Sequence, residues 1–126
     1  MDSKILVVDD EAHITQLIEQ TLEDLEDEGV QLLIATNGEE ALEIIEKEKP
    51  QLVFLDVMMP NINGFEVCHT VKNEWNMSDI YIIMLTAKGQ ELDKEKGKEA
   101  GADMYITKPF DPDALHDKAV EILGVK

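Results

Sequence analysis

The sequence predicts a doubly wound α/β fold, with five strands in one parallel sheet and five helices, in a single domain over residues 1–126. Short runs of β-branched and aliphatic residues alternate with longer segments in which apolar residues recur every three or four positions. The short runs are apolar on both faces, as in strands that helices cover on either side. With 126 residues, 44% of them hydrophobic, the chain is large enough for one core of this kind.

The five expected strands are residues 5–8, 32–35, 52–55, 80–85 and 104–106. Because helical segments separate them, we expect right-handed crossovers and parallel strands. The first helix has apolar residues at spacings of three and four up to Leu25, and Gly29 ends it. Asn37 and Glu40 form a start signal for the second helix, and a proline lies beyond its end.

Three further helices complete the pattern. A stripe of Cys68, Val71 and Trp75 predicts the third helix, and Asp111 followed by a proline predicts the start of the last one. Between these two, residues 88–100 carry many charges and few apolar side chains. We expect a helix there that burial anchors weakly and that is easily displaced.

The composition argues against several classes of function. The chain has 28 Asp and Glu against 11 Lys and no Arg, a formal net charge of −17, which disfavours direct binding to nucleic acid or to anionic membranes. No apolar run approaches the roughly 20 residues that a membrane span needs. The single cysteine can form neither an internal disulfide nor a multi-cysteine metal site. We therefore expect a cytoplasmic protein without a nucleic-acid or membrane partner.

Polar residues that could form a reactive site follow the expected strands, with the second strand as the exception. Asp9 and Asp10 follow the first strand, Asp56 the third, Thr86 the fourth and Lys108 the fifth, whereas the second strand offers no ionisable group. In open parallel sheets, ligands bind at the carboxyl ends of the strands, near the point where the strand order reverses. The second strand therefore fits an edge position, which predicts the order 2-1-3-4-5 and brings the three aspartates together.

Such a cluster has an excess of negative charge. Two like charges about 4 Å apart repel by roughly 4 kcal/mol at an effective dielectric constant near 20. Three carboxylates and the Lys108 ammonium leave a formal charge of −2, so either a carboxylate is protonated or a divalent cation completes the site. Oxygen ligands with room for water favour Mg²⁺ over Ca²⁺. Asp56, alone at the middle of the sheet, is the candidate to accept a phosphoryl group.

Four motifs at four strand ends then resemble a known family. They are Leu6-Val7-Val8-Asp9-Asp10-Glu11, Leu55-Asp56-Val57-Met58-Met59-Pro60 with Gly64, Met84-Leu85-Thr86-Ala87, and Lys108-Pro109-Phe110. In this order and spacing they resemble the response-regulator receiver domain of two-component signalling, over essentially the whole chain. The resemblance implies a flavodoxin-like fold and a switch that phosphorylation activates.

The resemblance also assigns the chemistry. It implies that Asp56 is the phosphoacceptor, and that a sensor histidine kinase or a phosphotransfer protein supplies the phosphoryl group in a Mg²⁺-dependent reaction. Asp10 would bind Mg²⁺ directly together with Asp56, Asp9 would hold it mostly through water, and the backbone carbonyl of Met58 would be a further ligand. Lys108 would pair with Asp56 and then with a phosphoryl oxygen.

The same resemblance predicts how the signal leaves the site. The Thr86 hydroxyl would move to the phosphoryl group, Tyr105 would swing inward behind it, and the surface around residues 88–100 and Tyr105 would change for a downstream effector. We expect a monomer or a weak, phosphorylation-dependent dimer. No enzymatic activity is expected beyond self-phosphotransfer and self-dephosphorylation.

Two alternatives come from other classes. A Mg²⁺-dependent phosphatase with an aspartyl-phosphate intermediate needs a second acid two residues after the nucleophile, to protonate the leaving group. Met58 occupies that position and cannot transfer a proton. The other alternative is a scaffold that keeps the fold without being phosphorylated. The chain retains all the residues that the phosphorylation chemistry would need, which argues against this alternative.

Overall fold

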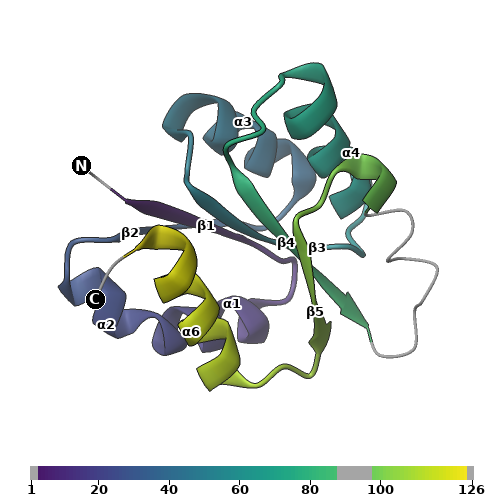
Figure 1. The fold of residues 1–126 in the computed structure, drawn as a ribbon. Coiled ribbons are helices and arrows are strands. Elements are labelled where there is room, and N and C mark those ends of the chain that lie inside the picture. The colour runs from purple at the N-terminus through teal and green to yellow at the C-terminus, as the bar shows by residue number, and fades with distance from the viewer. Residues whose placement is uncertain (1–2, 88–97, 125–126) are drawn as a thin grey trace.

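The computed structural model describes residues 3–87 and 98–124 and contains one five-stranded sheet (Figure 1). Its strands are β1 (Lys4–Val8), β2 (Gln31–Ala35), β3 (Leu52–Asp56), β4 (Tyr81–Ala87) and β5 (Met104–Lys108). All neighbouring pairs are parallel, and the order is β2-β1-β3-β4-β5. The predicted fold class and strand order are therefore confirmed.

Helices cover both faces of this sheet. They are α1 (Ala12–Thr21), α2 (Glu23–Asp27), α3 (Gly38–Glu48), α4 (Gly64–His69), the π-helix η1 (Thr70–Glu74) and α6 (Pro112–Leu123). Residues 98–100 are also helical, while the rest of the expected helix over 88–100, residues 88–97, lies outside the described residues. Across the described part of the chain, no helix has both the length and the apolar character that crossing a membrane requires.

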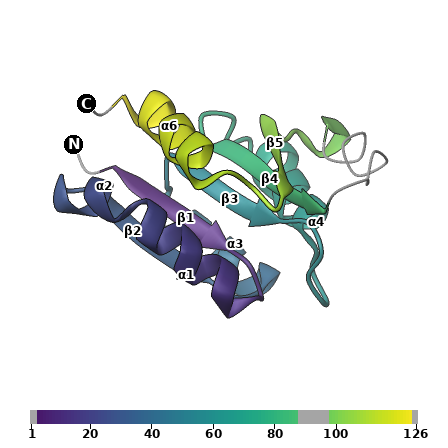
Figure 2. The ribbon, with the colours of Figure 1, turned by 90° about the horizontal axis from the view of Figure 1, so that it is seen from below.

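The two faces of the sheet build two separate cores. Because side chains alternate along a strand, Phe54 joins the core under α1, α2 and α6, and its neighbour Val53 joins the core under α3 and α4. Figure 2 shows α1 and α6 side by side over β1 and β3, on the face that carries Phe54. Burying each such side chain contributes about 1.5–3 kcal/mol.

Burial along the strands matches their places in the sheet. Every residue of β3 is buried, and so are residues 5–8 of β1, whereas the edge strands β2 and β5 consist mostly of half-buried residues. The apolar runs at the centre of the sheet therefore reflect cover on both faces. The carboxyl ends of β1 and β3 lie at this centre.

The structure differs from the expected helices at two points. The first expected helix is divided at Leu22, whose φ of −102° and ψ of 9° interrupt the helix while both Leu22 and Leu25 remain fully buried. The third expected helix changes from α to π at Thr70, where the Trp75 N–H donates to the Thr70 carbonyl at 2.8 Å. The wider turn lets Trp75 pack against the same core as Val71.

The predicted helix starts at Asn37 and Asp111 are confirmed. The Asn37 side chain accepts a hydrogen bond from the Glu40 N–H at 2.8 Å, and the Glu40 carboxylate accepts one from the Thr36 N–H at 3.0 Å. The Asp111 carboxylate accepts from the Asp113 N–H at 3.0 Å, with proline in the first turn as expected. These caps pair N–H groups that the helices themselves leave without partners.

Candidate functional site

The register of the central strands brings the predicted aspartates together. Val8 of β1 pairs with Leu55 of β3, so that the next residues, Asp9 and Asp56, follow at the same edge of the sheet. The Asp9 N–H continues the ladder on the other side and donates to the Ala35 carbonyl at 3.2 Å. Asp9 is fully buried and Asp56 is 4% exposed. Two buried carboxyl groups therefore lie at the carboxyl end of the sheet.

Four carboxylates gather at this point. Asp9, Asp10, Glu11 and Asp56 each offer one oxygen, and these oxygens all lie within 4.8 Å of one another. Asp10 and Glu11 are exposed, and the Glu11 N–H donates to the Asp9 carboxylate at 3.0 Å. No role for Glu11 was predicted from the sequence, although its place directly after the two aspartates was a signal that it belongs to the cluster.

Among the residues that the structure describes, Lys108 is the cation of this cluster. Its ammonium lies 2.9 Å from Asp9 Oδ2, 3.3 Å from Asp56 Oδ1 and 3.7 Å from Glu11 Oε1. β5 carries this lysine to the site from the far side of β4, 52 residues along the chain from Asp56. One ammonium thus faces three carboxylates, which leaves negative charge in excess.

The imbalance is reflected in the acidity of Asp56. Burial, and then the charge of Asp9, raise the pKa of Asp56 from its ordinary value of 3.8 to about 7, although Lys108 and the Met58 N–H oppose the rise. Burial lowers the pKa of Lys108, but hydrogen bonding to Asp9 and the charge of Asp56 outweigh this effect, and the pKa is raised. Lys108 therefore stays protonated, and Asp56 is only partly ionised near neutral pH unless further positive charge is present.

The loop after β3 is held against the site. The Met58 N–H lies 3.4 Å from Asp56 Oδ1, while the Met58 side chain is 64% exposed. The Gly64 N–H donates to the Val57 carbonyl at 3.0 Å. A Cβ at Gly64 would overlap the Asp56 carbonyl oxygen and crowd the Val57 backbone, so only glycine allows this close approach.

The two predicted switch residues lie on β4 and β5. Thr86 is 2% exposed and pairs with Thr107 of β5. It directly follows Leu85, which pairs with Asp56 in the register of β3 and β4. Tyr105 pairs with Met84 and packs partly buried against the core that contains Cys68, and burial raises the pKa of its hydroxyl. The structure places Thr86 at the carboxyl end of β4, and the movements of both residues stay predictions.

The residues present fit a hard divalent cation. The cluster supplies only oxygen ligands, and its carboxylates outnumber the ammonium that faces them. Two of them, on Asp10 and Glu11, are exposed and leave room for water, which Mg²⁺ usually retains in proteins. A divalent cation would also supply the positive charge that the buried Asp56 requires.

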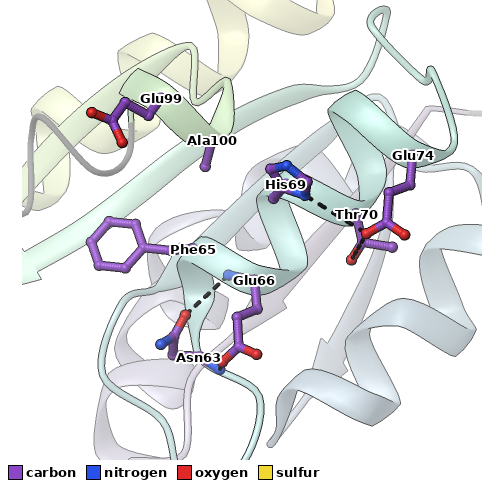
Figure 3. A pocket seen from close by; sticks show the side chains of 8 residues that line it. All are labelled: Asn63, Phe65, Glu66, His69, Thr70, Glu74, Glu99 and Ala100. Carbon is purple, nitrogen blue, oxygen red and sulfur yellow. Dashed lines mark hydrogen bonds and ion pairs between the residues drawn. The ribbon is translucent and has the colours of Figure 1, made fainter.

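A hollow of about 540 Å³ lies elsewhere, between α4 and η1 on one side and residues 99–100 on the other (Figure 3). Two of its lining residues, Asn63 and Glu66, form a capping box, in which the Asn63 side chain accepts from the Glu66 N–H at 3.0 Å. None of the predicted site residues lines this hollow. The hydrogen bonds between Asn63 and Glu66 cap the start of α4, so these two residues have a structural role. The candidate site therefore remains at the aspartates.

Comparison with known proteins gives a consistent result. The family model for the response regulator receiver domain matches residues 5–120. The chain is 46% identical over 123 residues to the alkaline phosphatase synthesis transcriptional regulatory protein PhoP of Bacillus subtilis, covering 98% of this chain and 49% of PhoP. It is 48% identical over 120 residues to the probable transcriptional regulator ycf27 of Porphyra purpurea, covering 95% of this chain and 47% of that protein.

Solved structures agree with these relatives. The chemotaxis response regulator CheY4 of Vibrio cholerae superimposes with a TM-score of 0.84 at 32% identity, covering 97% of this chain and 99% of CheY4. The chain spans about half the length of the curated relatives that it matches, and nearly all of the CheY4 chain.

Proposed function

The chain is a receiver domain of the response regulator family, and on that premise we propose that Asp56 accepts a phosphoryl group from a histidine kinase or a phosphotransfer protein. One observation carries the proposal. Asp56 is a buried carboxylate at the end of the central strand, 3.3 Å from a lysine ammonium and within 4.8 Å of three further carboxylates. A structural ion pair does not need that excess of acids, whereas a site that binds a cation and receives a phosphoryl group does.

The residues of the chain divide the chemistry between them. A carboxylate oxygen of Asp56 forms a bond to phosphorus as the bond from phosphorus to the donor atom breaks. The donor atom is a histidine nitrogen in a kinase or an acyl oxygen in acetyl phosphate. The Lys108 ammonium, already 3.3 Å from Asp56 Oδ1, neutralises charge on the phosphoryl oxygens. The Met58 N–H, near the same oxygen, helps to orient the carboxylate.

Mg²⁺ would be held by Asp10 and Asp56, by Asp9 through water, and by the backbone carbonyl of Met58. When bound, it screens the charge of the attacking carboxylate and the phosphoryl group from each other. The raised pKa of Asp56 supports this assignment, because the carboxylate needs added positive charge to ionise near neutral pH. In this proposal Glu11 is not a direct ligand.

Phosphorylation would change the surface through two residues. The new group carries a charge of about −1.5 to −2 and three strong acceptor oxygens. We propose that the Thr86 hydroxyl turns to these oxygens and that Tyr105 moves inward, altering the surface around Tyr105 and residues 88–100. The recipient is a downstream effector protein or a further part of a longer regulator; the curated relatives, of which the chain covers about half, are named as transcriptional regulators. With a net charge of −17, the domain itself is unsuited to binding nucleic acid.

The test is phosphorylation by a small-molecule donor. Incubating the protein with Mg²⁺ and acetyl phosphate should add one phosphoryl group that survives acid and is removed by hydroxylamine, as measured by mass spectrometry. Asp56→Asn should abolish it, and chelating the Mg²⁺ should reduce it strongly. Asp79→Asn, an exposed aspartate before β4, is the matched control and should be phosphorylated like wild type. Wild-type incorporation by Asp56→Asn would refute the assignment.

A second assay addresses enzymatic activity. We propose that the domain transfers phosphoryl groups only to itself and hydrolyses only its own acyl phosphate. The Met58 thioether, two residues after Asp56, cannot protonate the leaving group of a monoester. Turnover of p-nitrophenyl phosphate with Mg²⁺ should therefore stay at the level of Asp56→Asn, and turnover that depends on Asp56 would favour a phosphatase.

A further inference from the structure

Glu11 differs from the two buried acids of the cluster, Asp9 and Asp56, in how it is held. Its Oε1 atom lies 3.7 Å from the Lys108 ammonium, compared with 2.9 Å for Asp9 and 3.3 Å for Asp56. Its side chain is 51% exposed, whereas those of Asp9 and Asp56 are 0% and 5% exposed. Glu11 therefore lies on the solvent side of Lys108, at the mouth of the site.

The backbone nevertheless fixes Glu11 at this position. Its N–H donates to Asp9 Oδ1 at 3.0 Å, so a buried carboxylate of the site itself orients the residue. Its other carboxylate oxygen, Oε2, lies 3.6 Å from His13 Nε2, on a ring that is 73% exposed. The Glu11 charge thus stays within 4.8 Å of the site's oxygens without being enclosed by the protein.

We propose that Glu11 strengthens the binding of a divalent cation through its charge, without being a direct ligand of the cation. This inference rests on the proposed Mg²⁺ site. When all four carboxylates are ionised, the cluster with Lys108 carries a formal charge of −3, of which Glu11 contributes one unit. At about 5 Å in a water-like medium with salt, that unit should change the affinity for a divalent cation about three- to tenfold.

The location of the charge sets how the effect depends on salt. An exposed charge acts through solvent, and salt screens its effect. The screening length is about 30 Å at 0.01 M salt and about 3 Å at 1 M salt. A direct ligand, in contrast, loses a metal–oxygen bond when it is removed, and that loss persists in salt. Salt dependence therefore distinguishes a charge at the mouth of the site from a ligand of the cation.

The experiment measures Mg²⁺ binding without any phosphodonor. Isotope-labelled protein is titrated with MgCl₂ at low and at high NaCl, and backbone amide shifts give the dissociation constant. Glu11→Gln should bind about three- to tenfold more weakly than wild type at low salt and within about twofold of it at high salt. Glu46→Gln, which makes the same change on the exposed surface near the end of α3, is the matched control and should bind like wild type.

Two outcomes would overturn the inference. Equal affinities for Glu11→Gln and Glu46→Gln at low salt would show that Glu11 has no role, and a loss that persists at high salt would make it a direct ligand. The variant Asp10→Asn distinguishes a wrong role for Glu11 from a wrong assignment of the Mg²⁺ site in the proposed function. If Asp10→Asn still binds Mg²⁺ like wild type, the proposed cation site is wrong, whereas if it loses binding, an unaltered Glu11→Gln contradicts only the role of Glu11.

Discussion

Two lysines with largely buried side chains, Lys72 and Lys108, have contrasting surroundings. The Lys72 side chain is 8% exposed, and its ammonium lies 2.8 Å from Asp103 Oδ2 and 3.3 Å from the Ser78 carbonyl. Asp103 Oδ2 also accepts from the Ile82 N–H at 2.8 Å. Within residues 3–87 and 98–124, one ammonium here meets one carboxylate, and each group also has a backbone hydrogen-bond partner.

Lys108 is 18% exposed and instead faces three carboxylates, with a fourth in the same cluster. The pair at Lys72 joins η1 to the turn before β5, and its charges cancel. Among the described residues the charges around Lys108 do not cancel, and burial together with the charge of Asp9 raises the pKa of Asp56 to about 7. Burial of a lysine therefore does not by itself mark a functional site, whereas charge left in excess around it does.

The largest expected effect is at the balanced pair. Lys72→Met keeps most of the apolar stem but leaves Asp103 without its cation, so we expect the free energy of unfolding to fall by about 3–5 kcal/mol. Urea denaturation measures this loss. Lys47→Met, on the exposed surface of α3, is the control and should change stability by no more than about 0.5 kcal/mol. A loss of less than about 1 kcal/mol at Lys72 would contradict a structural role for the pair.

At the unbalanced cluster, the opposite sign is expected. Folded Asp56 keeps its proton up to about pH 7, whereas the unfolded carboxyl releases it near its ordinary pKa of 3.8. Wild-type stability should therefore fall between these pH values, and Asp56→Asn, which does not ionise, should be more stable than wild type by about 4 kcal/mol at pH 8 without Mg²⁺.

Urea denaturation of wild type and Asp56→Asn at pH 4 and at pH 8 tests this expectation. The difference should nearly vanish at pH 4, where both side chains are uncharged. Adding Mg²⁺ at pH 8 should stabilise wild type more than the variant, because it binds the folded cluster. An Asp56→Asn variant that is less stable than wild type at pH 8 would show that the cluster is balanced like the pair at Lys72.

A smaller effect is expected where backbone packing, rather than charge, shapes the cluster. Gly64→Ala places a Cβ against the Asp56 carbonyl oxygen, so we expect a loss of about 2 kcal/mol in stability. Phosphorylation by acetyl phosphate should also slow, since the loop that carries Met58 must shift. Gly29→Ala is a useful comparison, because its Cβ would meet no atom within 4 Å, although its φ of +101° costs stability. It should destabilise the protein without changing the phosphorylation rate.

The smallest expected effect tests whether the hydrogen bond of Asn73 is energetically coupled to the ion pair of Lys72. The Asn73 side chain donates to the Ala100 carbonyl at 3.1 Å, and the buried Cys68 thiol lies 3.5 Å from the same oxygen. Asn73→Ala should cost about 1 kcal/mol, the usual value of one hydrogen bond. Measured with Lys72→Met in a double-mutant cycle, a coupling above about 0.5 kcal/mol would show that the two contacts act as one unit. Additive losses would show two independent contacts.

Much of the fold and part of the site were predictable from local patterns. Apolar runs predicted the five strands, and the side chains of Asn37 and Asp111 predicted two helix starts, because these signals act within a few residues. The strand order was predictable because ionisable residues follow the first and third strands but not the second. The gathering of Asp9, Asp10 and Asp56 with Lys108 followed from that order.

Other features depended on the three-dimensional arrangement. The sequence by itself determined which acids follow β1 and β3, but the number of carboxylates that meet Lys108, and the inclusion of Glu11, depended on register and side-chain direction. The break at Leu22 and the pairing of Lys72 with Asp103, 31 residues apart, were decided only when the elements packed. The physical reason is range: periodicity and capping act between near neighbours, whereas burial and charge depend on everything that folding brings within a few ångströms.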